Sequence, residues 1–273
     1  MESAKTRTLG PRLAVGFVLG AVFLLSLLHP LAFTLLVAVA SGFAAAELSV
    51  AMRSAGWHVP RLVAFLAPGI VISTYFLSAE GQWLGLLISI SLLVVWRIAT
   101  LIYTSNKQSF KQTLRDFGGT AFVLVYVPLL LSFSIQLVLE PVGVQWVLGL
   151  VLTVVIIDTF GYLIGRFFGK TKLSPEISPK KTWEGLVASI FEAFVGGQVL
   201  VLITPATFVF GLVFGAAILL SSVLGDLSES LIKRDLNVKD MGRVLPGHGG
   251  VLDRIDSLIP SSFVAFLMSQ LVF

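Results

Sequence analysis

The stretch ATFVFGLVFGAAILLSSVLGDLSESLI, residues 206–232, decides the fold class of this chain. Residues 206–224 carry no charged side chain, and an apolar run of about 18 residues or more is typical of a transmembrane helix. A helix over the whole stretch is about 40 Å long at 1.5 Å per residue, whereas the hydrocarbon core of a bilayer is roughly 30 Å thick. We therefore expect this helix to tilt, or to protrude with its polar end on the cytoplasmic side.

Similar apolar runs fill the rest of the chain. Of the 273 residues, 56% are hydrophobic and only 12% are charged, whereas about a quarter of a soluble domain is charged. Apolar runs of this length predict an all-α integral membrane protein. We expect nine transmembrane helices, near residues 11–28, 31–52, 62–78, 82–103, 118–138, 142–165, 185–204, 206–232 and 251–273.

The basic residues predict how these helices are oriented. If the N-terminus is cytoplasmic, all nineteen lysines and arginines fall in cytoplasmic segments. The opposite loops hold Glu80 and Glu140 and no positive charge. Since cytoplasmic loops are enriched in Lys and Arg, the N-terminus is predicted inside and the C-terminus outside. The first apolar run lacks a small-residue cleavage site, so it is predicted to be a retained anchor.

The acidic residues divide the chain into two parts. Glu47 is the lone clear acidic residue inside a helix of the first half, and we expect it to have a structural role. Charged groups near a bilayer are costly, so the dense charges of the second half indicate chemistry or ion handling. The prediction is a five-helix bundle over residues 1–140 and a four-helix catalytic bundle over 141–273, with cytoplasmic loops 166–184 and 233–250.

One face of the 206–232 helix is polar at its cytoplasmic end. Asp226, Glu229, Ser230 and Lys233 recur at helical spacing and share this face. Charged side chains are not turned toward lipid because their burial in hydrocarbon is expensive. The face is therefore predicted to line a polar cavity that opens to the cytoplasm.

A second acidic face lies at the start of the last helix. Asp253 and Asp256 are three residues apart, so they stack on one side of a helix. With Asp226 they predict a Mg²⁺ site, because Mg²⁺ binds carboxylates, waters and substrate phosphates. Whether a second cation shares the site is left open. The alternative is a set of salt bridges to the nearby basic residues Lys233, Arg234 and Arg254.

A glycine-rich turn, LPGHGG, residues 245–250, separates the two acidic segments. Gly249 and Gly250 permit close backbone approach, and successive amides in such a turn can cradle phosphate oxygens. His248 can donate a hydrogen bond to a phosphate, and Lys239 and Arg243 add positive charge beside the turn. Most glycine-rich turns are plain connections, so the predicted phosphate loop depends on these neighbours.

Another basic cluster lies in the connection GRFFGKTKLSPEISPKKTWEG, residues 165–185. Lys180 and Lys181 precede a helix that Thr182 is expected to cap, and a helix N-terminus after two lysines suits an anion. The alternative is an interfacial loop whose lysines face lipid phosphates. Asp158, about two turns before this connection, favours a polar cavity because hydrocarbon does not tolerate it.

These residues resemble the signature of the phosphatidate cytidylyltransferases, a family also called CDP-diacylglycerol synthases. The segment SPKKTWEG, residues 178–185, is similar to that family, as is the run DxxxYxxGRxFGKxKLSP from Asp158 to Pro175. At Gly161 the pattern has Ala. The run 230–256 carries the rest of the resemblance, with Lys233-Arg234, Lys239-Asp240, Pro246, His248-Gly249-Gly250, Asp253-Arg254 and Asp256.

The resemblance implies that CTP and phosphatidic acid give CDP-diacylglycerol and pyrophosphate with Mg²⁺, at the cytoplasmic face of the inner cell membrane. The implied metal ligands are Asp226, Asp253 and Asp256. The implied catalytic residues are Asp226, Lys233, Lys239, His248, Asp253 and Asp256. The implied substrate-binding residues are Asp158, Lys180, Lys181, Arg234, Arg243, Gly249 and Gly250.

The expected partners are CTP, phosphatidic acid and the bilayer lipids, with no nucleic acid. The apolar first half offers a surface for a homodimer. Two other functions stay open at this point. A cation-coupled transporter would use the acidic residues as an ion path, but no acidic set continues toward the opposite face. A CTP-dependent polyprenol kinase would share the phosphate chemistry.

Overall fold

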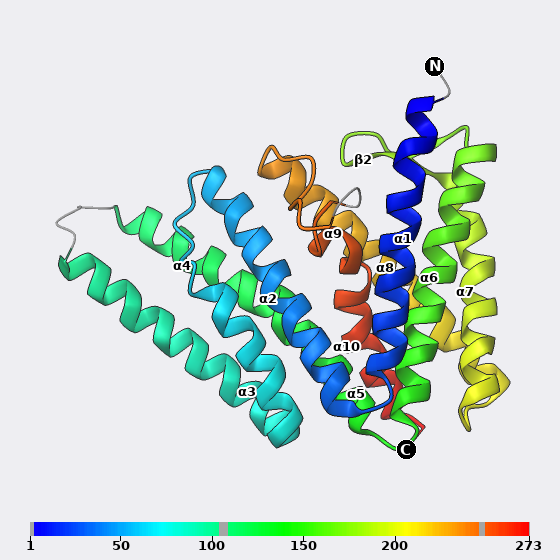
Figure 1. Ribbon diagram of the computed structural model, residues 1–273, viewed down its shortest axis with the longest axis horizontal. Helices are drawn as coiled ribbons and strands as arrows, with labels where there is room; N and C mark the ends of the chain where they lie inside the picture. Colours follow the sequence, from blue (N-terminus) through cyan, green and yellow to red (C-terminus); the bar gives the residue numbers. More distant parts are fainter. Residues whose placement is uncertain (1–2, 104–108, 246–248, 273) are drawn as a thin grey trace. The chain divides into compact units, whose positions relative to one another are not determined.

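Figure 1 shows the computed structural model, which describes residues 3–103, 109–245 and 249–272. The described part is mainly helical, which agrees with the predicted all-α class. Its elements are α1 (Ser3–Ser26), α2 (Pro30–Ser54), α3 (Val63–Tyr103), α4 (Phe110–Leu124), the π-helix η1 (Val125–Leu129), α5 (Leu130–Leu139), α6 (Gly143–Phe168), β1 (Lys172–Ser174), β2 (Ser178–Thr182), α7 (Trp183–Ile203), α8 (Phe208–Asp235), α9 (Leu252–Ile255) and α10 (Leu258–Ser269).

Six candidate membrane spans occur among the described residues, by length and composition. They confirm a membrane protein of helical class, whereas the predicted number of nine helices stays a prediction. The six are Pro30–Ser54, Val63–Thr100, Phe110–Leu139, Gly143–Phe168, Trp183–Ile203 and Phe208–Asp235.

The chain forms two compact units, and each is built from two separate stretches. The first unit contains residues 1–135 and 236–254, and the second contains residues 136–235 and 255–273. The predicted functional division after residue 140 stays a prediction. The structure adds that residues 236–254, here called the signature loop, group with the N-terminal helices.

Helix α2 is the centre of the first unit. It contacts α1, α3, α4 and η1, and Ala44, Ala45 and Leu48 on it are fully buried. Small side chains at these positions allow neighbouring helices to approach closely, which is how helices associate where lipid removes the hydrophobic driving force.

Helix α3 folds back on itself at Ser78, whose backbone has φ 49° and ψ −131°. Gly85 packs against Ile70 and Ser73, although a straight helix would separate residues 70 and 85 by about 22 Å. Figure 1 shows the resulting hairpin of two arms in cyan. The bend lies at the junction between the predicted spans 62–78 and 82–103.

The second unit packs α6, α7, α8 and α10 around a core at Trp146. The Trp146 ring meets Phe210 and Phe214 edge-on, each with a centroid separation of 5.9 Å. Glycines lie where the helices cross: a Cβ on Gly197 of α7 would overlap the carbonyl of Gly211 on α8. These crossings bring the helix backbones together and fix their relative rotation.

A short hairpin connects α6 to α7, where the sequence predicts only a loop. Strand β1 pairs antiparallel with β2, with Lys172 opposite Thr182 and Ser174 opposite Ser178. Thr182 then caps α7 as predicted, because its Oγ1 accepts a hydrogen bond of 3.2 Å from the Gly185 amide. The hairpin therefore ends at a defined point on the first turn of α7.

Candidate functional site

The second unit brings together five charged residues, here called the carboxylate–lysine cluster: Asp158 on α6, Lys181 on β2, Asp226 and Lys233 on α8, and Asp256 before α10. Lys181 Nζ lies 2.8 Å from Asp226 Oδ2. Asp256 interacts electrostatically with Asp226, Asp158 and Lys233, and Asp158 interacts with Asp226 and Lys181. The cluster thus joins four of the predicted segments.

A glycine crossing places Asp226 beside Asp256. Gly225 of α8 lies against the Asp256 carbonyl and Pro260, so that a Cβ at Gly225 would overlap both. About one turn earlier, the hydroxyls of Ser221 and Ser261 share a hydrogen bond of 2.9 Å. Because the backbones touch here, the side chain that follows Gly225 projects next to the start of α10.

Close packing of α6 on α7 brings Asp158 and Lys181 into the same cluster. Gly165 of α6 lies against the Thr182 hydroxyl, and Gly161 lies against Ser189 of α7. A Cβ at Gly161 would require the Ser189 hydroxyl to move, whereas the other neighbouring atoms lie at 3.5 Å. The hairpin strand that carries Lys181 is therefore held against the α6 face that carries Asp158.

The polar face predicted for α8 is present. Ser230 Oγ donates to Asp226 Oδ1 at 3.3 Å, and Lys233 forms an ion pair with Glu229, whose side chain is almost fully buried. The two pairs interleave at four-residue spacing along one side of the helix. The face thus combines two carboxylates with one hydroxyl and one ammonium group and is distinct from the apolar remainder of α8.

Arg234 and Lys180 have separate places near this cluster. Arg234 Nε donates to the Ile177 carbonyl at 3.2 Å, so it ties the hairpin turn to the end of α8. Lys180 is exposed, and neighbouring residues of a strand point to opposite faces. Of the two adjacent lysines, Lys181 is therefore the one that reaches the carboxylates. Substrate binding by Lys180 and Arg234 stays a prediction.

The signature loop lies in the first unit and contains the other predicted site residues. Both Asp253 carboxylate oxygens accept from the Met241 amide, at 3.1 and 3.3 Å, and Oδ2 also accepts from the Gly250 amide at 2.8 Å. The Leu245 amide donates to the Gly249 carbonyl, and Gly249 has φ +86°. Lys239 and Arg243 are exposed. His248 lies outside the described residues.

Glu47 contacts this loop, which the sequence did not indicate. Its carboxylate accepts from the Val251 amide at 3.0 Å and from the Leu252 amide at 2.9 Å. The partners are more than 200 positions later in the chain. The predicted structural role of Glu47 thus has specific partners, which are two amides next to Asp253.

The donor atoms of the cluster are of the type that a hard divalent cation binds. Asp158, Asp226 and Asp256 offer only oxygen ligands, which Mg²⁺ prefers. Among the described residues, no group of three or more His, Cys, Asp or Glu side chains is arranged to hold a metal ion. The Lys181 ammonium lies at Asp226, where it supplies a positive charge to the carboxylates. The predicted set Asp226, Asp253 and Asp256 stays a prediction.

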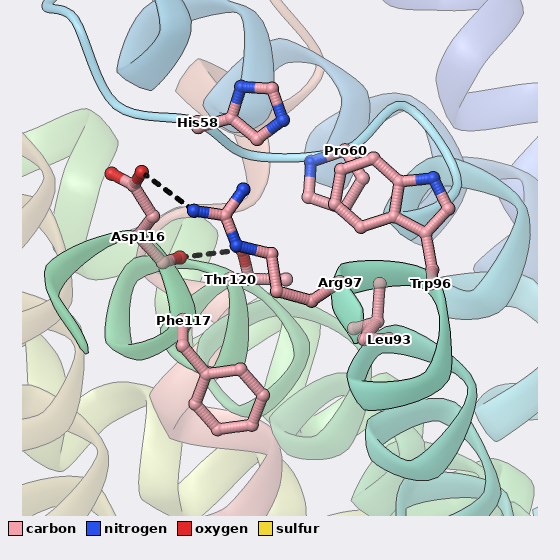
Figure 2. A pocket seen from close by; sticks show the side chains of 8 residues that line it. All are labelled: His58, Pro60, Leu93, Trp96, Arg97, Asp116, Phe117 and Thr120. Atoms are coloured by element: carbon pink, nitrogen blue, oxygen red, sulfur yellow. Dashed lines mark hydrogen bonds and ion pairs between the residues drawn. The ribbon is translucent and has the colours of Figure 1, made fainter. Parts of the chain in front are cut away.

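A separate charged hollow lies in the first unit and was not predicted. Figure 2 shows Arg97 directed toward Asp116, at an Nη2–Oδ2 distance of 3.8 Å. His58 stacks on Trp96 at the edge of this hollow. Arg115 also pairs with the buried Asp116 at 3.0 Å. This single carboxylate pairs with two arginines, which indicates a structural centre.

The fold and the cluster define a class of protein: a polytopic helical membrane protein with a cluster of carboxylates and lysines. Residues 10–272 match the cytidylyltransferase family, and the chain belongs to that family. It is similar to phosphatidate cytidylyltransferase of Mycobacterium bovis, with 36% identity over 278 residues, covering 97% of this chain and 90% of that protein.

Two further relatives have the same description. Phosphatidate cytidylyltransferase of Mycobacterium leprae is 34% identical over 284 residues, covering 97% of this chain and 89% of that protein. Chloroplastic phosphatidate cytidylyltransferase 4 of Arabidopsis thaliana is 43% identical over 130 residues, covering 45% of this chain and 33% of that protein. The similarity to the mycobacterial proteins therefore includes both halves of the chain.

Proposed function

We propose that the chain is a phosphatidate cytidylyltransferase, which converts CTP and phosphatidic acid into CDP-diacylglycerol and pyrophosphate. The observation that carries this proposal is the family match over residues 10–272, together with relatives of that name that cover 97% of the chain. The carboxylate–lysine cluster supplies the charges that the reaction needs. A cation-coupled transporter and a polyprenol kinase are not favoured by these relatives.

The reaction joins two anionic substrates. A phosphate oxygen of phosphatidic acid attacks the α-phosphorus of CTP, and the bond from that phosphorus to the bridging oxygen breaks. Pyrophosphate departs with the bonding electrons. The attacking phosphate is already ionised, so no strong general base is required, and catalysis depends on positioning and electrostatic stabilisation.

The ammonium groups of the cluster neutralise the substrates. Lys181 reaches Asp226 and is partly exposed, so it can turn from the carboxylate to an incoming phosphate. Lys233 is held by Glu229 on the same face of α8. Lys239 and Arg243 on the signature loop add exposed positive charge for the triphosphate. A Lys ammonium suits this role because it acts as a compact point charge on a flexible stem.

Asp226 and Asp256 are the proposed Mg²⁺ ligands of the second unit, and Asp253 is the proposed ligand of the signature loop. When bound, Mg²⁺ would neutralise triphosphate oxygens and assist the departure of pyrophosphate. In the cluster itself, Asp158 and Asp256 surround Asp226 with negative charge, which favours capture of a cation. A second cation in the same site is compatible with three carboxylates.

The membrane topology is part of the proposal. With nine passes and a cytoplasmic N-terminus, every Lys and Arg would lie on the cytoplasmic side, which agrees with the excess of positive charge in cytoplasmic loops. The fold-back of α3 at Ser78 supports counting its two arms as separate passes. The site would then face the cytoplasm at the inner membrane, where the acyl chains stay in the bilayer and the head group meets CTP.

A homodimer is also proposed, through the apolar helices of the first half. Large side chains along the second arm of α3, including Trp83, Leu87 and Val95, are exposed and can meet lipid or a second copy. Cross-linking in native membranes, followed by mass determination of the purified protein, distinguishes a surface covered by lipid from one covered by a second copy of the chain. A species of single-chain mass at all protein concentrations would contradict the dimer.

The catalytic proposal is tested with purified protein, labelled CTP, phosphatidic acid and Mg²⁺. We expect CDP-diacylglycerol and pyrophosphate in equal amounts, and no product when a polyprenol replaces phosphatidic acid. Labelled nucleotide transferred to neither lipid would refute the proposal. Phosphorylated polyprenol would instead identify a kinase.

The metal assignment is tested with Asp226→Asn and Asp256→Asn. Each substitution should abolish turnover while leaving a protein that can be extracted in folded form. Mg²⁺ should raise the melting temperature of the unaltered protein in EDTA-treated samples, and this increase should be absent in both variants, since a ligand that binds the native state stabilises it. An equal increase in all three proteins would place the metal elsewhere.

A further inference from the structure

Glu47 is a buried acid in a helix that otherwise packs apolar and small side chains. It lies on α2, seven residues before Ser54, and its side chain is 5% exposed. Both of its carboxylate oxygens accept a backbone hydrogen bond, one from Val251 and one from Leu252. A buried carboxylate near a membrane is costly, so these contacts need a reason beyond packing.

The signature loop is shaped around this carboxylate. Gly242 and Gly250 both approach it so closely that a Cβ at either position would overlap the Glu47 side chain. The two glycines are eight residues apart in the loop, and the carboxylate lies against both of them while it accepts from the Val251 and Leu252 amides. Any residue larger than glycine at these positions would displace Glu47 from the amides.

Asp253 holds the same segment by its own carboxylate. It accepts from the Met241 and Gly250 amides. The three consecutive amides of residues 250–252 thus donate to two carboxylates, that of Asp253 in the loop and that of Glu47 on α2. A buried amide that lacks an acceptor costs free energy. This pattern of hydrogen bonds therefore favours one backbone conformation for the segment that carries Asp253.

We propose that Glu47 is a positioning residue of the cytidylyl transfer site. It fixes the backbone at Val251 and Leu252 and thereby the orientation of Asp253. The proposal rests on the proposed function for its catalytic consequence, whereas the contact itself is independent of it. Glu47 touches no reacting atom. Its effect is geometric, and a displacement of about 1 Å at a reacting centre can cost on the order of 100-fold in rate.

The first test is Glu47→Gln, which keeps the size of the side chain. The amide can accept one of the two hydrogen bonds but presents its own NH₂ group to the other N–H. We expect kcat to fall on the order of 100-fold, with KM for CTP changed by less than about threefold. Hydrogen–deuterium exchange of the peptide containing residues 250–252 should become faster, which a change in global stability alone would not confine to this segment.

The matched control is Glu192→Gln, the same chemical change at another buried acid. Glu192 lies on α7, is 8% exposed, and its Oε2 has no hydrogen-bond partner among the described residues. Its kcat should stay within about threefold of the unaltered protein, and exchange of the signature loop should be unchanged. An equal loss in both variants would show that burial of an acid, and not the loop contact, is what matters.

A double-mutant cycle tests the shape of the contact. Gly242→Ala should reproduce the Glu47→Gln effects, because the new Cβ overlaps the carboxylate and displaces it. In a Glu47→Ala background the overlap is gone, so adding Gly242→Ala should cost no further activity. Residues that share one contact are non-additive in this way. Additive losses would overturn the proposal.

The outcomes separate this inference from the proposed function. If the unaltered protein makes no CDP-diacylglycerol, the function fails, and the exchange measurement still decides whether Glu47 holds the loop. If the unaltered protein is active and Glu47→Gln retains its kcat, the positioning role is refuted. Lost activity with unchanged loop exchange also refutes it. If Glu47→Gln cannot be purified in folded form, Gly242→Ala gives the deciding kcat and exchange values.

Discussion

Replacing Lys181 with Met separates the catalytic from the structural contribution of the carboxylate–lysine cluster. The substitution keeps the length and most of the volume of the side chain while it removes the ammonium that lies 2.8 Å from Asp226. Asp226 is then left with the negative charges of Asp158 and Asp256 as its neighbours. We expect a protein that folds normally and turns over slowly.

The expected magnitudes differ for stability and rate. The two side chains are 24% and 33% exposed, and a partly exposed ion pair contributes at most about 1 kcal/mol, a shift of about 2–4 °C in melting temperature. A donor that stabilises developing charge in the transition state is worth about 100- to 1,000-fold in kcat. The loss in rate should therefore far exceed what the small loss in stability explains.

Lys180→Met is the comparison, because Lys180 precedes Lys181 on β2 and is exposed. Steady-state formation of CDP-diacylglycerol, measured at saturating CTP and phosphatidic acid, gives kcat for both variants. We expect the Lys180 variant to lose less than about tenfold, as for a charge at the rim of a binding site. Equal losses in the two variants, or a Lys181 variant within about threefold of the unaltered protein, would refute the geometry inferred for the hairpin.

Three other substitutions test single contacts. Gly225→Ala should lower both melting temperature and kcat, since its Cβ meets the Asp256 carbonyl, and a variant with full activity would contradict the crossing that aligns the cluster. Arg234→Ala removes the hydrogen bond to Ile177, so limited proteolysis should cut the hairpin faster than in Lys180→Met. Asp116→Asn should destabilise the protein by about 1–3 kcal/mol, because Asp116 is buried whereas its partner Arg115 is 42% exposed, and kcat of the folded fraction should be unchanged.

Local features of this fold could be predicted from sequence because local physics sets them. Apolar length predicts the helices, and i,i+4 spacing predicts the shared face of Asp226 and Ser230. The Thr182 cap depends only on the three residues that follow it. Each of these needs no knowledge of how the chain folds in space.

Contacts between distant segments were not predictable in the same way. The Lys181–Asp226 pair requires the register of the β hairpin and the glycine crossings of α6 with α7. Small residues are visible in the sequence, but they do not reveal which helix each one meets. The sequence does not indicate the partners of Glu47, because these are backbone amides, which every residue except proline carries.

The wide separation of Glu47 and Leu252 also bears on the order in which the protein is made. The two are 205 residues apart, and at about 5–20 residues per second the ribosome needs roughly 10–40 s to synthesise the interval. Helix α2 enters the bilayer long before its carboxylate can meet the amides that it finally binds. Completion of the first unit therefore waits for the last tenth of the chain, and until then Glu47 lacks the two amides that its carboxylate binds in the folded protein.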